Sequence, residues 1–203
     1  MRYLAELLPN QRYHIINHAV GNENLFRKEE NYRYFLQKFY EYIHPVAQTY
    51  AYCLMPNHFH FLLNFREEEI LQAYYQKLYP QKNGNIENYH VFLMQRFSNF
   101  CNAYAKAYNK MYDRKGALFI DFLRRIRVES DEYFTNLLGY IHCNPKNHGF
   151  CKKPEDWFYS SYHAYKSEKT TNLPRQEVAE WFGTITLYEE YHQQFNQIID
   201  DNE

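Results

Sequence analysis

The stretch CLMPNHFHFLLNF, residues 53–65, decides the fold and holds the first candidate site residues. Side chains alternate between the two faces of a β-strand, so a strand over 58–65 places His58 and His60 on one face. The opposite face then carries four apolar side chains, Phe59, Phe61, Leu63 and Phe65. Immediately upstream, the turn dipeptide Pro56-Asn57 predicts a hairpin with a strand over 47–55.

Further strands and helices are expected on both sides of this hairpin. Loose alternation predicts a strand over 12–19, and a helical pattern covers 28–43 before Pro45. A polar, irregular region that runs through PQKNGN follows the hairpin. The remaining elements are a long helix over 88–112, a strand over 123–129, and a helix that Ser130 caps and that ends near Asn144, because Pro145 disfavours helical geometry in the residue before it.

The predicted order is βαββαβα, which is that of an α+β, ferredoxin-like fold: an antiparallel sheet with helices packed on one face. We expect one domain over 1–153. Residues 154–203 form an irregular and helical tail packed on the same domain.

The totals are those of a globular chain, with 203 residues of which 45% are hydrophobic. The four cysteines show no CxxC spacing, and the first twenty residues lack the apolar core of a signal peptide. No window approaches the roughly 18 apolar residues of a membrane span. We therefore expect a reduced, cytoplasmic protein with no membrane partner.

The net charge of -1 conceals an asymmetry along the chain. Residues 96–153 hold 11 basic and 5 acidic side chains, whereas residues 154–203 hold 3 basic and 10 acidic ones. Tyrosines are interleaved with the basic residues of the middle segment, a mixture that suits base stacking beside phosphate contacts, although several of these rings must belong to the core of a long amphipathic helix. The candidate phosphate contacts here are Lys106, Lys110, Arg114 and Lys115.

The helix that starts after Ser130 supplies further candidate site residues. Tyr140 and Asn144 are i and i+4, so their side chains can reach the same point. If this helix packs on the histidine face, Asn144 can join His58 and His60 as a metal ligand. Three neutral ligands leave a cation its full charge to act on a phosphate oxygen. A tyrosine hydroxyl can then form a covalent phosphotyrosine, with Tyr140 and Tyr133 as the rival candidates.

Three separated motifs carry a resemblance to a known family. PNHFHFLL, GYIHCNPKNHGF and DWFYSSYHAY, in this order and spacing, resemble the tyrosine transposases of the HUH class, and most closely the REP-associated tyrosine transposases. The match runs from about Tyr13 to about Tyr165. It implies an HUH endonuclease type of ferredoxin-like fold, with Tyr140 rather than Tyr133 as the nucleophile. It also implies that His58, His60 and Asn144 bind Mg²⁺ or Mn²⁺.

The resemblance also implies a reaction and a partner. The expected enzyme is a metal-dependent tyrosine transposase, a single-strand DNA endonuclease and strand transferase that acts at hairpin-forming sites through a 5′-phosphotyrosine intermediate. Its partner is single-stranded DNA with a palindromic hairpin, and relatives include monomers and swapped homodimers. The charge pattern adds three residues of the strand RRIR as DNA contacts, Arg124, Arg125 and Arg127.

Two other functions remain open from the sequence. A domesticated relative would bind a DNA or RNA hairpin without cleaving it, and a metal hydrolase of small phosphoesters would use the same ligands without a tyrosine. Of the other histidines, we expect His14 and His18 to pack or hydrogen-bond, and His142 to point away from Tyr140. His148 is a candidate DNA contact.

Overall fold

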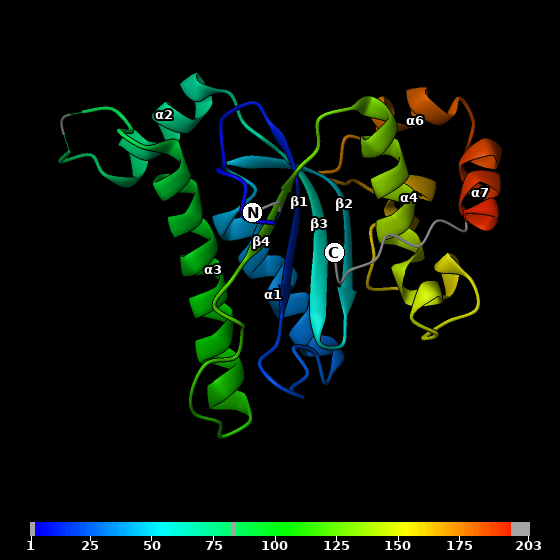
Figure 1. Ribbon diagram of the computed structural model, residues 1–203, viewed down its shortest axis with the longest axis horizontal. Helices are drawn as coiled ribbons and strands as arrows, with labels where there is room; N and C mark the ends of the chain where they lie inside the picture. Colours follow the sequence, from blue (N-terminus) through cyan, green and yellow to red (C-terminus); the bar gives the residue numbers. More distant parts are fainter. Residues whose placement is uncertain (1–2, 83, 196–203) are drawn as a thin grey trace.

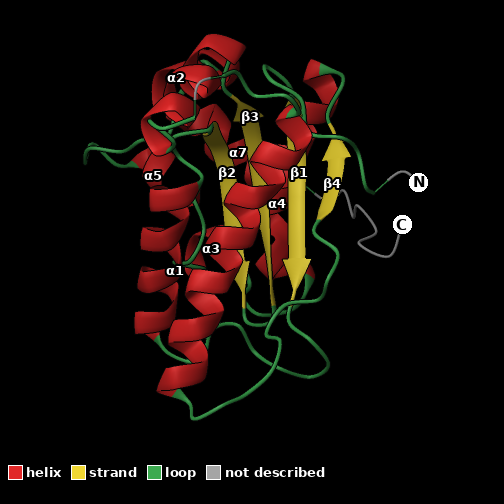
Figure 2. Ribbon diagram, turned by 90° about the vertical axis from the view of Figure 1, so that its left-hand side faces the viewer, coloured by secondary structure: helices red, strands yellow, loops and turns green. Residues whose placement is uncertain are grey.

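A four-stranded antiparallel sheet forms the centre of the protein, whose computed structural model describes residues 3–82 and 84–195. The strand order is β2-β3-β1-β4, as Figure 2 shows with the strands side by side. All three strand pairs are antiparallel. The strands are β1 (Arg12–His18), β2 (Ala47–Met55), β3 (His58–Phe65) and β4 (Arg124–Arg127). The predicted α+β fold and its four strands are confirmed.

Two helices, α1 (Glu29–Tyr42) and α3 (Tyr89–Met111), cover one face of the sheet. Aromatic rings fill the interface: Phe39 stacks on Phe61 with ring centroids 4.0 Å apart, and both rings belong to the same buried cluster. The apolar face of β3 is therefore the one that these helices cover. The Asn88 side chain accepts a hydrogen bond from the amide of Val91 and fixes the start of α3.

The opposite face is covered by α4 (Asp131–Asn147), which packs on β2 and β3. Figure 1 shows α3 on one side of the sheet and α4, followed outward by α6 and α7, on the other. The expectation of helices on one face is thus corrected. The reason is that apolar residues flank the histidines on this second face: Leu62 on β3 and Tyr50 on β2 form a second core with Phe134 of α4.

The end of α4 also differs from the prediction. The helix passes Pro145 and ends at Asn147. Pro145 lies within the last turn, where the proline removes a single backbone donor. Gly149 then adopts a left-handed conformation with φ 75°. Its amide donates to the carbonyl of Lys146, and the amide of Phe150 donates to that of Pro145, which is the hydrogen-bond pattern of a Schellman C-cap.

The region after β3 is not irregular throughout, because α2 (Glu68–Leu78) occupies its first part. Leu71 is the one buried residue among the eleven of this helix. An apolar stripe that short gives almost no periodic signal, which explains why the sequence did not reveal it. None of the helices in the described residues is long and apolar enough to cross a membrane.

The chain after residue 153 returns to the sheet and to α4. Ser160 bridges Cys53 on β2, and the amide of Leu54 donates to the carbonyl of Tyr159. Residues 196–203 of the predicted tail lie outside the described residues. The elements of the described part are η1 (Pro154–Asp156), α5 (Tyr162–Lys166), α6 (Arg175–Phe182) and α7 (Ile185–Gln194).

Candidate active site

His58 and His60 lie on the face of β3 that α4 covers, as the alternation of the strand requires. In the sheet register His60 lies opposite Ile16 of β1 and Cys53 of β2. Both imidazoles are buried, and that of His60 is 0% exposed. The pair is thus held in the middle of the sheet, between two strands and a helix.

The structure brings Tyr140 and Asn144 to the same place. The ring centroid of Tyr140 lies 5.8 Å from that of His60. Asn144 is fully buried one helical turn further along α4. Since all these residues belong to one chain, a single subunit brings the candidate nucleophile to the histidine pair.

His14 lies behind His60 on the neighbouring strand β1. Its Nε2 atom is 2.9 Å from Nδ1 of His60, so the expectation that His14 makes a hydrogen bond is confirmed. Burial lowers the pKa of His14 to about 3 and lowers the pKa of His60 well below its ordinary value, an effect to which the nearby His14 adds. Both rings are therefore neutral at pH 7, which is the form that binds a metal ion.

A second group of rings surrounds His58. His18 stacks on His58 with centroids 4.7 Å apart, and the ring of His148 lies 5.5 Å from it. The Asn57 amide oxygen is 2.8 Å from Nδ1 of His58. His148 is exposed, so the site meets solvent at this end. The sequence did not place His148 here, because the predicted helix ended before Pro145.

The side chain of Asn144 indicates that a metal ion fits the site. Neither its amide oxygen nor its amide nitrogen has a hydrogen-bond partner among the described residues, although both atoms are buried. Such a group is costly unless a ligand engages it. Across residues 3–82 and 84–195 no cluster of three or more His, Cys, Asp or Glu side chains could hold a metal. Asn144 lies on α4 between Tyr140, whose ring is near His60, and His148, whose ring is near His58.

The opposite side of α4 is fixed by α7. A Cβ atom on Gly139 would lie 2.7 Å from the Tyr191 ring and 2.9 Å from the Phe195 ring, so only glycine permits this approach. His142, two residues beyond Tyr140, has its Nδ1 atom 2.9 Å from Nε2 of His192. His142 thus points away from Tyr140, as expected, and connects the tyrosine helix to α7.

The chain resembles known proteins in sequence and in fold. No known protein-family profile matches the chain. Over 123 residues the chain is 27% identical to a protein of Haemophilus influenzae described as "Putative REP-associated tyrosine transposase", and the match covers 59% of this chain and 61% of that protein. The chain thus spans less than two thirds of the length of this curated relative.

A solved structure has a similar fold. It is the structure of a REP-associated tyrosine transposase bound to a REP hairpin, with a TM-score of 0.61 and 12% sequence identity, over 83% of this chain and 86% of that one. The resemblance to the REP-associated tyrosine transposases is confirmed. At this identity the structural match speaks for the fold, and the residue roles rest on the site itself.

The seven basic residues that were predicted to contact DNA fall into two groups. Arg125 is buried, and its guanidinium donates to the backbone carbonyls of Ala5, Leu123 and Leu4. Arg114 donates to the carbonyl of Ala117 and forms an ion pair with Glu23 at 3.4 Å. These two side chains make contacts within the protein, and their expected role as DNA contacts stays a prediction.

The other five basic residues are at least partly exposed. Arg124 lies near the Tyr3 ring, with its guanidinium carbon 5.8 Å from the centroid, and Arg127 donates to the Gln11 amide oxygen. These five residues are Lys106, Lys110, Lys115, Arg124 and Arg127.

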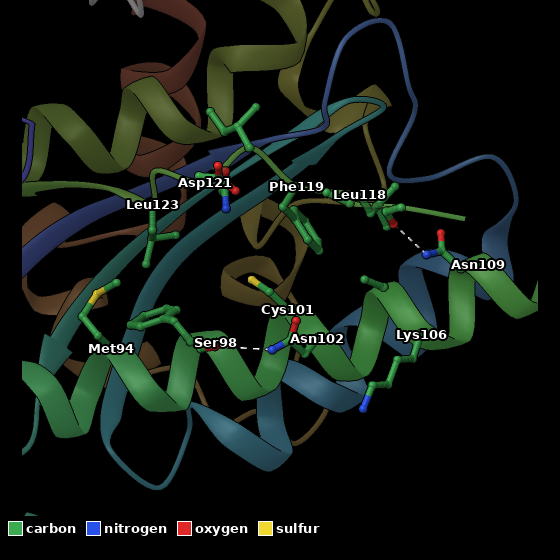
Figure 3. A pocket seen from close by; sticks show the side chains of 16 residues that line it. Met94, Ser98, Cys101, Asn102, Lys106, Asn109, Leu118, Phe119, Asp121 and Leu123 are labelled. Atoms are coloured by element: carbon green, nitrogen blue, oxygen red, sulfur yellow. Dashed lines mark hydrogen bonds between the residues drawn. The ribbon is translucent and has the colours of Figure 1, made fainter. Parts of the chain in front are cut away.

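Lys106 lines a groove that the sequence did not reveal. The groove has a volume of about 520 Å³ and lies between α3 and the segment 116–123. Figure 3 shows Asn102 and Lys106 on the helix and Phe119 and Asp121 on the facing segment. None of the four predicted catalytic and metal-binding residues lines it, so it is separate from the histidine and tyrosine cluster.

Proposed function

We propose that the protein is a transposase that cleaves and rejoins single-stranded DNA beside a hairpin, with Tyr140 as nucleophile. The observation that carries the proposal is the meeting of three features in one chain: the Tyr140 ring 5.8 Å from His60, the neutral His60 imidazole, and the buried Asn144 amide without a hydrogen-bond partner among the described residues. The Haemophilus influenzae relative and the hairpin-bound structure support a hairpin-forming DNA as substrate.

The covalent chemistry requires few groups. The Tyr140 hydroxyl oxygen attacks the scissile phosphorus and loses its proton to solvent, while the bond from phosphorus to the 3′ oxygen breaks and that oxygen takes up a proton. The products are a 5′-phosphotyrosine and a free 3′-hydroxyl. In the reverse step, a 3′-hydroxyl attacks the phosphotyrosine, a new phosphodiester forms, and Tyr140 is released.

His58, His60 and Asn144 would hold the divalent ion, Mg²⁺ or Mn²⁺. A bound divalent ion supplies positive charge to the scissile phosphate, which favours attack by an oxygen nucleophile. His14 keeps the His60 ring in a fixed orientation through the bond to Nδ1. The packing of α4 on β2 and β3 keeps water from most of the Tyr140 ring.

One observation favours the alternative, a hairpin-binding module without significant cleavage. Tyr140 is 2% exposed, so a DNA strand reaches its hydroxyl only after α4 or its neighbours move. The site meets solvent at His148, whose ring lies 5.5 Å from that of His58.

The test uses the wild type, Tyr140→Phe and the control Tyr133→Phe, each incubated with Mn²⁺ and single-stranded DNA from the flanks of the gene. A denaturing protein gel reports covalent adducts. We expect an adduct with the wild type and with Tyr133→Phe, and none with Tyr140→Phe or with a chelator present. Hairpin binding without an adduct from any of the proteins would establish the binding module, and an adduct that persists in Tyr140→Phe would assign the nucleophile to Tyr133.

A further inference from the structure

Two exposed phenylalanine rings lie in the segment that directly follows the tyrosine helix. Phe158 is 77% exposed and Phe150 is 50% exposed. Among the described residues one further phenylalanine, Phe122, is exposed to this degree. Isolated exposed apolar side chains are common, so the meaning of these two rings depends on the residues that surround them.

Both rings are held in place by other rings. Phe158 stacks on His163 with centroids 5.1 Å apart and an interplanar angle of 9°, and His163 Nε2 lies 2.8 Å from the carbonyl oxygen of Glu155. Phe150 packs on Trp157 at 5.7 Å, and the Trp157 indole donates to the carbonyl of Leu54. We call these four residues, Phe150, Trp157, Phe158 and His163, the aromatic platform.

The platform lies at the solvent end of the candidate active site. Phe150 is two residues beyond His148, whose ring is 5.5 Å from that of His58. The left-handed Gly149 and the hydrogen bond from the Phe150 amide to Pro145 fix the direction in which the chain leaves α4. Trp157 is bonded to β2 at Leu54, the residue before Met55, which pairs with His58. Phe150 and Trp157 are therefore tied to the same end of the sheet as His58.

The charge around the platform suits a polyanion. Lys152 and Lys153 are exposed, and Lys146 is partly exposed on the last turn of α4. The two acidic residues of this segment are engaged locally: Glu155 lies 3.9 Å from the Lys153 ammonium, and the Asp156 carboxylate accepts a hydrogen bond from the Lys153 amide. Exposed rings beside lysines are the combination that binds single-stranded nucleic acid by base stacking and phosphate contact.

We propose that the aromatic platform stacks unpaired bases of the DNA strand as it leaves the site of cleavage, while Lys146 and Lys152 contact its phosphates. This inference rests on the proposed function in that it assigns a subsite to the same DNA. The bases of a hairpin stem are paired and stacked on one another, so they offer no free face to Phe158. The platform therefore recognises the single-stranded flank and not the stem.

The test measures binding by fluorescence anisotropy with four probes: a hairpin alone, the same hairpin with unpaired thymidines, a short oligothymidine, and an abasic strand of equal length. The proteins are the wild type, Phe158→Ala, Phe158→Trp, Phe150→Ala and the control Phe122→Ala, which also removes an exposed ring. We expect the wild type and Phe122→Ala to bind the oligothymidine more tightly than the abasic strand. Phe158→Ala should lose about ten-fold in affinity for the oligothymidine, and Phe158→Trp should retain it.

The hairpin probes separate this inference from the proposed function. Both are supported if hairpin binding is equal in all variants, and if the thymidine extension strengthens binding in the wild type, Phe122→Ala and Phe158→Trp but not in Phe158→Ala or Phe150→Ala. If the wild type binds oligothymidine through Phe158 but binds no hairpin, the proposed function is contradicted, whereas base stacking on the platform is still supported. The inference is wrong if the wild type binds oligothymidine and the abasic strand equally tightly. It is also wrong if Phe158→Ala and the wild type bind oligothymidine equally tightly. Either result would point to a protein partner for the exposed rings.

Discussion

The Nε2 atom of His14 lies 2.9 Å from the Nδ1 atom of His60, across the pair of strands β1 and β3. Because Nδ1 of His60 is engaged in this way, a metal ion would bind through its Nε2 atom. A residue that holds a ligand ring in one orientation raises metal affinity without touching the metal. His14 is therefore part of the candidate site although it is not a ligand itself.

The first prediction tests this role of His14. His14→Leu removes the hydrogen bond to His60 at similar side-chain volume, and we expect Mn²⁺ affinity to fall by about 10-fold to 100-fold. His14→Gln retains a hydrogen-bonding group and should lose less. Calorimetric titration with Mn²⁺ measures both, with His44→Gln as a control at a partly buried histidine outside the site. Unchanged Mn²⁺ affinity in a folded His14→Leu would show that His14 only fills space.

The second prediction concerns Gly139. Its replacement by alanine places a Cβ atom 2.7 Å from the Tyr191 ring, so α7 must shift. We expect the free energy of unfolding to fall by about 1–3 kcal/mol, in spite of a gain of about 1 kcal/mol in helix propensity. Urea titration measures the change. Gly84→Ala, where an added Cβ meets nothing within 4 Å, is the control and should change stability little. A Gly139→Ala protein as stable as the wild type would contradict the close contact with α7.

A third prediction follows from the position of Tyr140 beside His60 of its own chain. Tyr140→Phe and His60→Ala should each fail to form an adduct with DNA, and a mixture of the two variants should fail as well. Adduct formation restored by mixing would mean that the tyrosine helix serves a second subunit. The measurement is the same denaturing gel, with the wild type mixed with each variant as the positive control.

The fourth prediction separates DNA contacts from structural arginines. Lys106→Ala and Lys110→Ala each remove an exposed cation of α3, and each should reduce the slope of log affinity against log salt by about one. Arg125→Met should leave that slope unchanged and lower the free energy of unfolding, because its guanidinium holds three backbone carbonyls. A reduced slope of log affinity against log salt in Arg125→Met would show that this arginine contacts DNA.

The fifth prediction is a loss of stability in mild acid. Burial lowers the pKa of His192 to about 4 and that of His14 to about 3, whereas a histidine of the unfolded chain titrates near 6.5. Between these values the unfolded chain binds protons that the folded chain does not, so stability is complete above about pH 6.5 and falls as the pH is lowered. Each histidine contributes up to about 1.4 kcal/mol per pH unit.

Urea titrations at about pH 7.5 and about pH 5.5, with a chelator present to exclude metal effects, measure this loss. His192→Phe removes one of the buried rings with a lowered pKa and should show a shallower dependence on pH. Equal stability of the wild type at the two pH values would contradict neutral, buried histidines at these positions.

The sequence revealed those parts of the fold whose signal is local. The hairpin of β2 and β3 follows from alternation and from the turn at Pro56-Asn57, and Tyr140 and Asn144 follow from their i, i+4 spacing. The predicted fold placed the helices on one face of the sheet, although the site hypothesis required the helix after Ser130 to pack on the histidine face. The structure shows that this helix, α4, forms the second layer. The short helix α2 was missed because it buries Leu71 alone.

Side-chain contacts between neighbouring strands could not be predicted from the sequence. The contact of His14 with His60 and the stacking of His18 on His58 depend on the register of β1 against β3, which alternation does not determine. The buried Arg125 donates hydrogen bonds to the carbonyls of residues 4 and 5, which lie more than a hundred positions away in the sequence. Charge alone therefore could not separate this arginine from those that remain exposed.

The packing of α7 on Gly139 has a consequence for the order in which the site is completed. A ribosome makes β1 and β3 first, then α4, and α7 last. A nascent chain therefore carries His58 and His60 long before it contains the helix that holds Tyr140 against them. The histidine pair is present early in synthesis, and the candidate nucleophile receives its final support only when residues 185–195 have joined the fold.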